Sequence, residues 1–342
     1  MTSHSIAIIG GLNMDMIYSV DRIPDVGESK DAISLVQCPG GKGANTAVAA
    51  YRASHTNPSQ KGRAGRQGGS STSTSDNIRV FMNGAVGRDA FGAQLKQQLE
   101  NNGVSTAAVR VLDGQVSGTC CVFVEKRTGE SRNIAYQGAN LQWTPLEASS
   151  VSCFVGGGSG VPDLIVLHLG IPADVVQGVL NTAAKTGVDT LLNPSPAVPL
   201  NSSTYKHLTH LVLNESEAAM LSGESLEKFQ GPAAWQKAGL YFIRLGVKNV
   251  VITLGAKGAF YATHEGEIGY VEAEKNITVV DATGAGDTFV GAYAVGYVTS
   301  KVKGQGKWNI AKAVKRACKA SAMTIQHFGA QESIPWSDEI DK

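Results

Sequence analysis

The stretch that decides the fold is LIVLHLGIPADVVQGVLNTAAKTGVDTLL, residues 164–192. It opens with an apolar run at 164–169 that has the length of a strand, and a second short run follows at 189–192. Between them, residues 173–185 form an Ala- and Val-rich segment long enough for a helix. A strand, a helix and a strand in this order predict a right-handed crossover between parallel neighbours.

The same alternation continues in both directions along the chain. We expect further strands at 5–10, 78–82, 211–213 and 250–254, and further helices at 43–53, 90–101, 216–221, 233–245, 285–299 and 310–327. Residues 119–124 and 132–136 are expected to pair as a hairpin. The fold class is therefore α/β, with a doubly wound, mostly parallel sheet flanked by helices, in a single domain over residues 1–342.

Two stretches interrupt this pattern. Residues 54–77 are rich in Ser, Gly, Thr, Gln and Arg and contain almost nothing apolar, which predicts a flexible surface insertion. Residues 156–160, GGGSG, are expected to form a second flexible tract.

Composition limits the classes of protein to which the chain can belong. With 342 residues, 42% of them hydrophobic and 17% charged, it has enough apolar material for a large core. A formal net charge of +1 argues against a nucleic-acid partner. Five cysteines without a CxxC pair predict neither a disulfide framework nor a zinc site. No run approaches the ~18 apolar residues of a membrane span. We therefore expect no membrane association and a cytoplasmic location, with the nucleus left open.

Polar and glycine residues follow several predicted strands directly. Asn193, Asn214 and Gly255 stand at the ends of three of them. Open α/β sheets bind their ligands at the carboxyl ends of the strands, so these positions predict a ligand site along that edge.

The strongest chemical signal is VDATGAGDTF, residues 280–289, at the start of a predicted helix. Small residues at 284–286 let backbone N–H groups face an anion at a helix N-terminus. Asp287 beside such an anion fits a general base that takes a proton from an attacking hydroxyl during phosphoryl transfer. The plainer alternative is a glycine-rich turn in which Asp287 stabilises the first helical turn.

Two earlier motifs point to a polar ligand. GGKGAN at 40–45 opens a predicted helix, and its glycines permit close approach to the backbone while Lys42 and Asn45 supply donors. It lacks the spacing of a P-loop. Asp15, in NMD at 13–15, is suited to accept two hydroxyls of a polyol. An ordinary glycine turn and an ordinary turn aspartate remain the alternatives.

Two later motifs suit a nucleotide. Glu217, in NESE at 214–217, fits a carboxylate that holds Mg²⁺ through water, although the motif taken alone favours a helix cap. TLGAKG at 253–258 is a predicted strand end that turns through glycines. Such a turn suits a nucleotide phosphate, and a simple turn is the alternative.

In this order, the five motifs resemble the ribokinase branch of the PfkB carbohydrate kinase family. The resemblance runs from about Ile6 to Trp336, and its two most diagnostic patterns, GGKGAN and DxxGAGD, are intact. It implies a ribokinase-like fold with a small β-sheet lid from about 14–38 and 117–137. In ribokinases two such lids pair, so a homodimer through the lid is expected.

The resemblance implies ATP-dependent phosphorylation of D-ribose to D-ribose 5-phosphate, with Mg²⁺ and activation by K⁺. Asp287 would be the base, and the backbone of Gly284, Ala285 and Gly286 the anion hole. The sugar site would comprise Asn13, Asp15, Gly41, Lys42, Gly43, Asn45 and Asp287. The nucleotide site would comprise Asn214, Thr253, Leu254, Gly255, Ala256, Lys257, Gly258, Gly286 and Cys318. Glu217 would act on Mg²⁺, and K⁺ would be held at Asp281, Thr283, Thr324, His327, Gly329 and Ser333. Residues 329–335, GAQESIP, resemble the family's closing loop.

Two positions depart from the family pattern. Gly170 stands where ribokinases usually carry a sugar-contacting glutamate, and Cys318 replaces a polar residue beside the adenine. A sugar hydroxyl left without its acceptor costs about 1–3 kcal/mol. Because of Gly170, the acceptor could instead be fructose, deoxyribose or a nucleoside. A sugar-binding relative without catalysis is a further alternative. A nicotinamide oxidoreductase is disfavoured, because no GxGxxG follows the first strand.

Overall fold

The computed structural model describes residues 4–59, 78–127, 131–156, 160–303 and 308–342. The expected insertion lies outside these ranges from residue 60 to residue 77, as does the centre of the expected tract at 156–160. Among the described residues, no helix combines the length and the apolar character needed to cross a bilayer.

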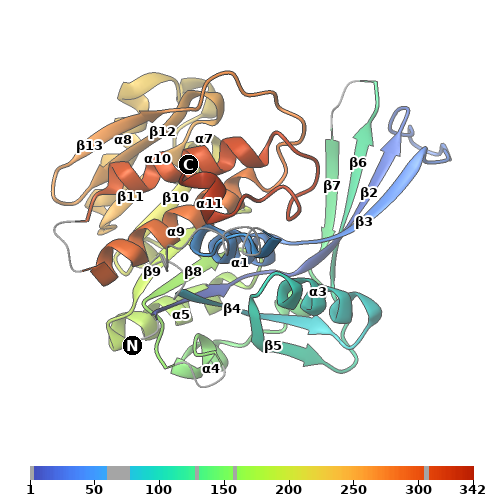
Figure 1. Ribbon diagram of the computed structural model, residues 1–342, viewed down its shortest axis with the longest axis horizontal. Helices are drawn as coiled ribbons and strands as arrows, with labels where there is room; N and C mark the ends of the chain where they lie inside the picture. Colours follow the sequence, from blue (N-terminus) through green and yellow to red (C-terminus); the bar gives the residue numbers. More distant parts are fainter. Residues whose placement is uncertain (1–3, 60–77, 128–130, 157–159, 304–307) are drawn as a thin grey trace, which may run out of the picture.

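A nine-stranded sheet forms the centre of the molecule, in the order β13-β12-β11-β10-β9-β8-β1-β4-β5 (Figure 1). Six of its pairings are parallel, and only β11–β12 and β12–β13 are antiparallel. The strands are β1 (His4–Ile9), β4 (Ile78–Gly87), β5 (Ser105–Leu112), β8 (Leu164–His168), β9 (Asp189–Asn193), β10 (His210–Asn214), β11 (Asn249–Thr253), β12 (Gly258–Thr263) and β13 (Ile268–Glu272). The predicted doubly wound, mostly parallel sheet is confirmed.

Helices cover both faces of this sheet, so its central strands are apolar on both sides. In β1, Ile6 and Ile8 belong to one buried cluster, whereas Ala7 and Ile9 belong to the other. The first cluster lies under α1 (Lys42–Ser54), α3 (Ala90–Asn101), α9 (Ala285–Lys303) and α10 (Ile310–Thr324). The second lies under α4 (Pro145–Ala148), α5 (Ala173–Thr186), α6 (Ser202–Tyr205), α7 (Glu215–Ser222) and α8 (Gly231–Arg244).

Strand β1 marks the point where the chain changes direction across the sheet. It pairs with β4 on one side and with β8 on the other. The chain first extends through β4 to β5 and then returns to build β8 through β11. A crevice opens at the carboxyl ends of the strands at such a switch point, which makes the end of β1 the expected place for a ligand.

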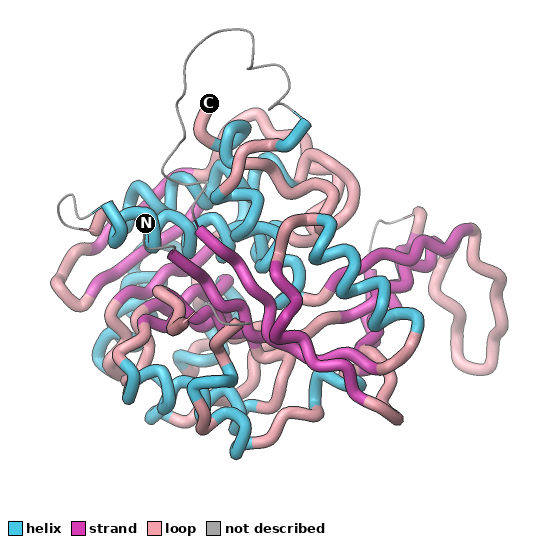
Figure 2. Tube along the Cα trace, turned by 60° about the horizontal axis from the view of Figure 1, so that its bottom comes forward, coloured by secondary structure: helices cyan, strands magenta, loops and turns pink. Residues whose placement is uncertain are grey.

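A second, four-stranded sheet projects from the side of the large body (Figures 1 and 2). Its order is β3-β2-β6-β7, formed by β2 (Asn13–Val20), β3 (Ser34–Gly40), β6 (Gly118–Glu125) and β7 (Ser131–Tyr136). The expected hairpin is confirmed as the antiparallel pair β6–β7. Because β2 follows β1 after three residues, the small sheet is attached directly to the switch point.

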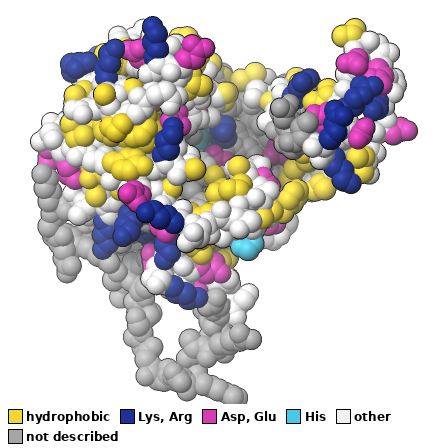
Figure 3. Space-filling view, turned by 90° about the horizontal axis from the view of Figure 1, so that it is seen from above, with side chains coloured by type: hydrophobic (Ala, Val, Ile, Leu, Met, Phe, Trp, Pro, Cys, Tyr) yellow, Lys and Arg dark blue, Asp and Glu magenta, His cyan; other side chains and the backbone are white. Residues whose placement is uncertain are grey.

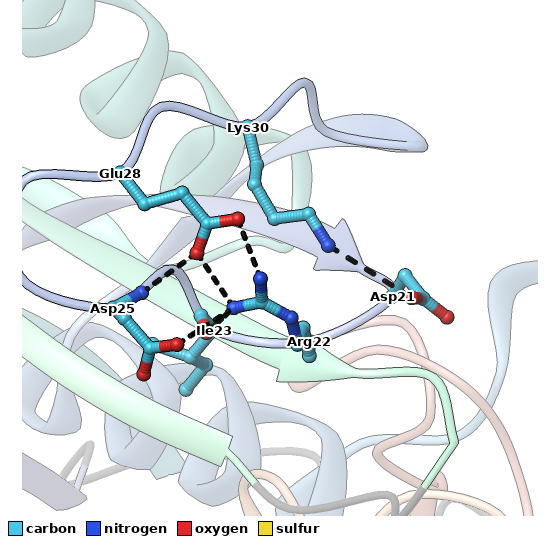
Figure 4. A network of polar contacts seen from close by, with 6 residues as sticks. All are labelled: Asp21, Arg22, Ile23, Asp25, Glu28 and Lys30. Carbon is cyan, nitrogen blue, oxygen red and sulfur yellow. Dashed lines mark hydrogen bonds and ion pairs between the residues drawn. The ribbon is translucent and has the colours of Figure 1, made fainter.

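A polar network closes the turn between β2 and β3 at the tip of the small sheet (Figure 4). The Arg22 guanidinium donates to Glu28 at 2.7 Å and to the Ile23 carbonyl at 3.2 Å. The Asp25 backbone N–H donates to Glu28 at 3.0 Å, and Lys30 pairs with Asp21 at 3.9 Å. These bonds bring the chain back, so that β3 returns beside β2 toward the large body.

Several elements differ from the sequence expectations, among them the unpredicted short helices α4, α6 and α11 (Ser337–Ile340) and the longer β4 and α9. β5, β12 and β13 were not predicted, and the last two form an antiparallel edge beside β11. The helix expected over 310–327 ends at Thr324, where the chain turns and the His327 N–H donates to the Thr324 carbonyl. The Ile325 carbonyl instead accepts from the Val280 N–H at 2.7 Å, which ties this turn to the start of the 280–289 motif.

Candidate active site

Asn13 and Asp15 lie on β2, where the small sheet leaves the large body. The Asn13 side-chain oxygen accepts a hydrogen bond from Asn140 at 2.8 Å, and the Asn140 amide is fully buried and also bonds to the Leu12 backbone. The Asp15 carboxylate lies so close to Gly40 that a Cβ built on Gly40 would stand 2.2 Å from its Oδ2. Both polar side chains are therefore held at the end of β1.

Helix α1 begins against the same strand end. Gly41 precedes the helix with φ 91°, and a Cβ there would lie 2.7 Å from the Asn13 nitrogen and from the Gly11 carbonyl oxygen. Only glycine fits this conformation at this distance. The close contact sets the start of α1, and with it Lys42 and Asn45, beside Asn13 and Asp15.

Asp287 lies in the first turn of α9 and is 5% exposed. Its Oδ2 accepts a hydrogen bond from Asn45 at 2.9 Å. Burial raises the pKa of Asp287, while the charge of Lys42 and the Asn45 bond act in the opposite direction. The structure thus joins the two most diagnostic motifs, although they are more than 200 residues apart.

Two carboxylates share the charge of one lysine in this cluster. Burial and the charge of Asp287 raise the pKa of Asp15 to about 7, and Lys42 partly offsets this rise. Since Lys42 also lowers the pKa of Asp287, its ammonium serves both groups. The two carboxylates and Lys42 therefore form one electrostatically coupled cluster in a mostly buried place.

A pocket of about 530 Å³ opens beside the N-terminus of α9. Six residues of the predicted nucleotide site line it, namely Thr253, Gly255, Ala256, Gly258, Gly286 and Cys318. Its other lining residues are Ala273, Glu274, Asn276, Ile277, Val279, Ala282, Ala285, Phe289, Ser321, Ala322 and Ile325. A Cβ built on Gly286 would meet nothing within 4 Å, so the helix terminus is open on this side. Figure 3 shows the surface hollowed between the large body and the small sheet.

Three residues predicted for the nucleotide site are not among those that line this pocket. Leu254 is buried in the core, and Asn214 caps α7. The Lys257 ammonium bonds to Glu215 at 2.9 Å and lies 5.9 Å from the centre of the Trp235 ring. The segment 273–279, which follows β13, contributes five lining residues that no sequence motif marked.

Glu217 is buried and completes a capping box at the start of α7. Its Oε2 accepts from the Asn214 N–H at 2.9 Å, and the Asn214 side chain accepts from the Glu217 N–H at 2.8 Å. The helix-cap alternative is therefore realised in the structure. Burial raises the pKa of Glu217, whereas Lys42 lowers it. Within the described ranges, no three His, Cys, Asp or Glu side chains come close enough together to hold a metal ion.

Three of the positions predicted for K⁺ are joined by hydrogen bonds where two loops meet. Asp281 accepts from the Thr283 N–H at 2.9 Å and from the Gly329 N–H at 3.1 Å. Thr324 is buried, and its hydroxyl donates to Thr288 at 3.1 Å. In the part of the chain that the structure describes, the buried hydroxyl of Ser333 has no hydrogen-bond partner. His327 follows α10 in the same turn.

The structure places both positions that depart from the family pattern, Gly170 and Cys318. A Cβ on Gly170 would lie 3.1 Å from the Gly11 nitrogen, so the end of β8 packs tightly against the backbone that follows β1. His168 is fully buried, and burial lowers its pKa to about 3, which makes it a neutral core residue at physiological pH. Cys318 lines the pocket as a half-buried thiol.

Two buried amides belong to the site but carried no role in the sequence analysis. Asn140 holds Asn13, as described above, and Gln331 donates to the Asn45 oxygen at 3.0 Å. Gln331 stood within the quoted GAQESIP segment, whereas Asn140 follows the predicted hairpin without a distinguishing pattern.

Comparison with known proteins agrees with this geometry. A family model described as pfkB family carbohydrate kinase matches residues 3–337. A ribokinase of Schizosaccharomyces pombe is 34% identical over 98% of this chain and 96% of its own length. A ribokinase of Bacillus subtilis is 30% identical over 99% of this chain and 98% of its own. A crystal structure of a ribokinase from Thermotoga maritima, 27% identical, gives a TM-score of 0.77 and covers 99% of this chain and 98% of that one. The chain is therefore a carbohydrate kinase that belongs to the pfkB family.

Proposed function

We propose that this kinase transfers the γ-phosphate of ATP to D-ribose, giving D-ribose 5-phosphate and ADP. The observation that carries the proposal is the buried Asp287 carboxylate at the N-terminus of α9, which Asn45 holds next to Asp15 and Lys42. The relatives named ribokinase support ribose as the acceptor.

In this reaction Asp287 takes the proton of the ribose 5-hydroxyl as the oxygen attacks the γ-phosphorus in line. A new P–O bond forms to the sugar, and the bond to the bridging oxygen of ADP breaks. The burial that raises the pKa of Asp287 strengthens it as a base. The N–H groups of residues 284–286 lie at the positive end of the α9 dipole and would stabilise the charge on the transferred group.

The acceptor side comprises Asn13, Asp15, Gly41, Lys42, Gly43 and Asn45. Their position at the end of β1, on both sides of the junction between the sheets, supports this assignment. The adenosine part of ATP would occupy the 530 Å³ pocket beside Cys318, where most of the lining is apolar. The pocket lining does not include Asn214, Leu254 or Lys257. We propose that they support the nucleotide site from outside this lining.

Two cations fit the chemistry of the residues present. Mg²⁺ prefers few carboxylates and several waters, and Glu217 supplies one buried carboxylate. When bound with ATP, Mg²⁺ neutralises phosphate charge. K⁺ would be held by oxygens of Asp281, Thr283, Thr324, His327, Gly329 and Ser333. The unpartnered buried hydroxyl of Ser333 supports an oxygen-rich site there.

The small sheet is proposed as a lid over the sugar within a single kinase domain, and as the surface of a homodimer. Ile134 and Tyr136 are 68% and 61% exposed. The sheet register places them, with Leu35, on the face opposite Asp15. Light scattering of the purified protein tests this: a dimer that Ile134→Glu converts to a monomer is expected, and a wild-type monomer would contradict it.

The function is tested by ADP release from Mg²⁺-ATP with D-ribose, with and without K⁺. Ribose-dependent release that K⁺ stimulates is expected. Release without dependence on K⁺ would refute the cation site, and the absence of ribose-dependent release would refute the acceptor.

Another sugar acceptor is the second candidate, and Gly170 favours it. The tight packing of Gly170 against Gly11 leaves this position without the carboxylate that ribokinases usually present to the sugar. Deoxyribose, fructose and nucleosides are therefore compared with ribose by kcat/KM in the same assay. A sugar-binding protein without catalysis would bind ribose and ATP but release no ADP with any of these acceptors.

A further inference from the structure

Three buried side chains form a line that ends at Asp287. Gln331 Nε2 donates to Asn45 Oδ1 at 3.0 Å, and Asn45 Nδ2 donates to Asp287 Oδ2 at 2.9 Å. Gln331 is 1% exposed, and the other two are 5% exposed. We call Gln331, Asn45 and Asp287 the amide relay.

Only one orientation of the Asn45 amide suits both of its neighbours. An ionised carboxylate can only accept, so the Asn45 NH₂ must face Asp287 and its oxygen must face Gln331. The Gln331 NH₂ satisfies that oxygen. Without this donor the buried Asn45 oxygen has no partner, so the orientation that faces the NH₂ toward Asp287 loses part of its stabilisation.

Arg52 fixes the loop that carries Gln331. Its guanidinium donates to the backbone carbonyls of Gln331 and Ile334, both at 2.8 Å. It also donates to the Asn102 side chain at 2.7 Å. Because Asn45 and Arg52 are seven residues apart on α1, they lie on one face of the helix. The same helix therefore anchors the loop and carries the amide that the loop orients.

We propose that Gln331 is a positioning residue that sets the orientation of Asn45 and, through it, secures an N–H donor for Asp287. The inference rests on the proposed function, since it takes Asp287 as the base. With Oδ2 occupied by the Asn45 N–H, Oδ1 is the oxygen left to receive the proton of the acceptor. The other charged groups around Asp287 are Lys42 on α1, Asp15 on β2 and Glu217 on α7.

Gln331→Met tests the relay, because it removes the donor while nearly preserving side-chain length. Loss of the oriented N–H disfavours the ionised form of Asp287, so the acid limb of the kcat–pH profile is expected to move to higher pH. We expect kcat to fall about tenfold at pH 6 and the deficit to shrink toward pH 9. KM for ATP should stay within about twofold.

Gln177→Met is the matched control. Gln177 lies on α5 and also donates its side-chain NH₂ to an asparagine oxygen, that of Asn181, at 3.0 Å. Its replacement should leave the profile unchanged. In an Asn45→Ala background, Gln331→Met should have no further effect on kcat, because the relay is already interrupted.

The effect of Gln331 on Asp287 can also be measured by NMR titration without any sugar. In protein labelled with ¹³C at aspartate carboxyls, the Asp287 resonance, assigned by its loss in Asp287→Asn, is titrated in wild type and in Gln331→Met. A higher midpoint in the variant supports the proposal even if wild type does not phosphorylate ribose, which would refute only the proposed function. Equal midpoints, or a kcat deficit that is constant with pH, would overturn it and leave Gln331 a purely structural residue.

Discussion

Replacing Asp15 by asparagine should stabilise the protein above neutral pH while removing a proposed sugar contact. The Asp15 carboxylate is mostly buried, lies against Gly40 and feels the charge of Asp287. These neighbours raise its pKa from an ordinary value of 3.8 to about 7. Asparagine keeps the shape of the side chain and cannot ionise.

The magnitude follows from this shift. Between pH 3.8 and about 7, the folded protein holds a proton on Asp15 that the unfolded chain has released, so raising the pH through this window destabilises the fold. A shift of about three units corresponds to about 4 kcal/mol. Because the side chain keeps some contact with solvent, we expect about 2–4 kcal/mol at pH 8 relative to pH 4.5.

The assay compares the unfolding of wild type and Asp15→Asn from pH 4.5 to pH 8.5. With about 2.1 cal/mol/K of unfolding entropy per residue, the expected gain of the variant is roughly 3–6 °C in Tm at pH 8. Titrating groups far from Asp15 act equally in both proteins, so the difference reports Asp15 together with its coupling to Asp287 and Lys42. The exposed Asp31 serves as control, and Asp31→Asn should show no pH-dependent difference. A gain that is flat with pH, or one that turns into a loss as the pH rises, would refute the reasoning.

Three further outcomes are expected. Asp287→Asn should lower kcat by about 10²–10⁴-fold with an unchanged circular dichroism spectrum, and a near-normal kcat would exclude it as the base. Arg52→Met keeps an apolar stem near Trp336 but loses the loop contacts, so urea unfolding should show about 2–4 kcal/mol less stability; an unchanged midpoint would contradict the anchoring role. His168 and His210 are buried with pKa values lowered to about 3. In the unfolded chain both histidines bind protons below about pH 6.5, whereas the folded protein keeps them neutral. The free energy of unfolding, measured in urea, should therefore fall by roughly 3 kcal/mol for each histidine between pH 6 and pH 4. Replacing either histidine by a neutral side chain should lessen this fall.

Much of the large sheet could be predicted because its strands are locally encoded. The stretch 164–192 became β8, α5 and β9 with shifts of only one residue at their ends. Continuous burial on both faces leaves a simple apolar run in the sequence. β12 pairs with β11, and β13 with β12, as consecutive antiparallel hairpins. They escaped prediction because the glycine-rich start of β12 was interpreted as a ligand turn.

The part of the candidate site that lies in short sequence motifs could be predicted. Asp287, Asn45 and Asp15 were chosen from local patterns, and the structure brings them together. The partners that orient them could not be found this way. Asn140 bonds to Asn13 across 127 residues and Gln331 to Asn45 across 286, and a buried amide has no periodicity that marks it in one sequence.

The bond between Asn45 and Asp287 also sets an order of assembly during synthesis of the chain. It joins residues 242 positions apart. At about 5–20 residues per second, a ribosome needs roughly 10–50 s to cover that interval. Throughout it, the polar start of α1 has been made but its buried partner has not. Gln331, whose backbone carbonyl Arg52 contacts, is made later still, after Asp287. The Asn45 amide therefore waits for its buried acceptor long after the residues of its own helix have been made.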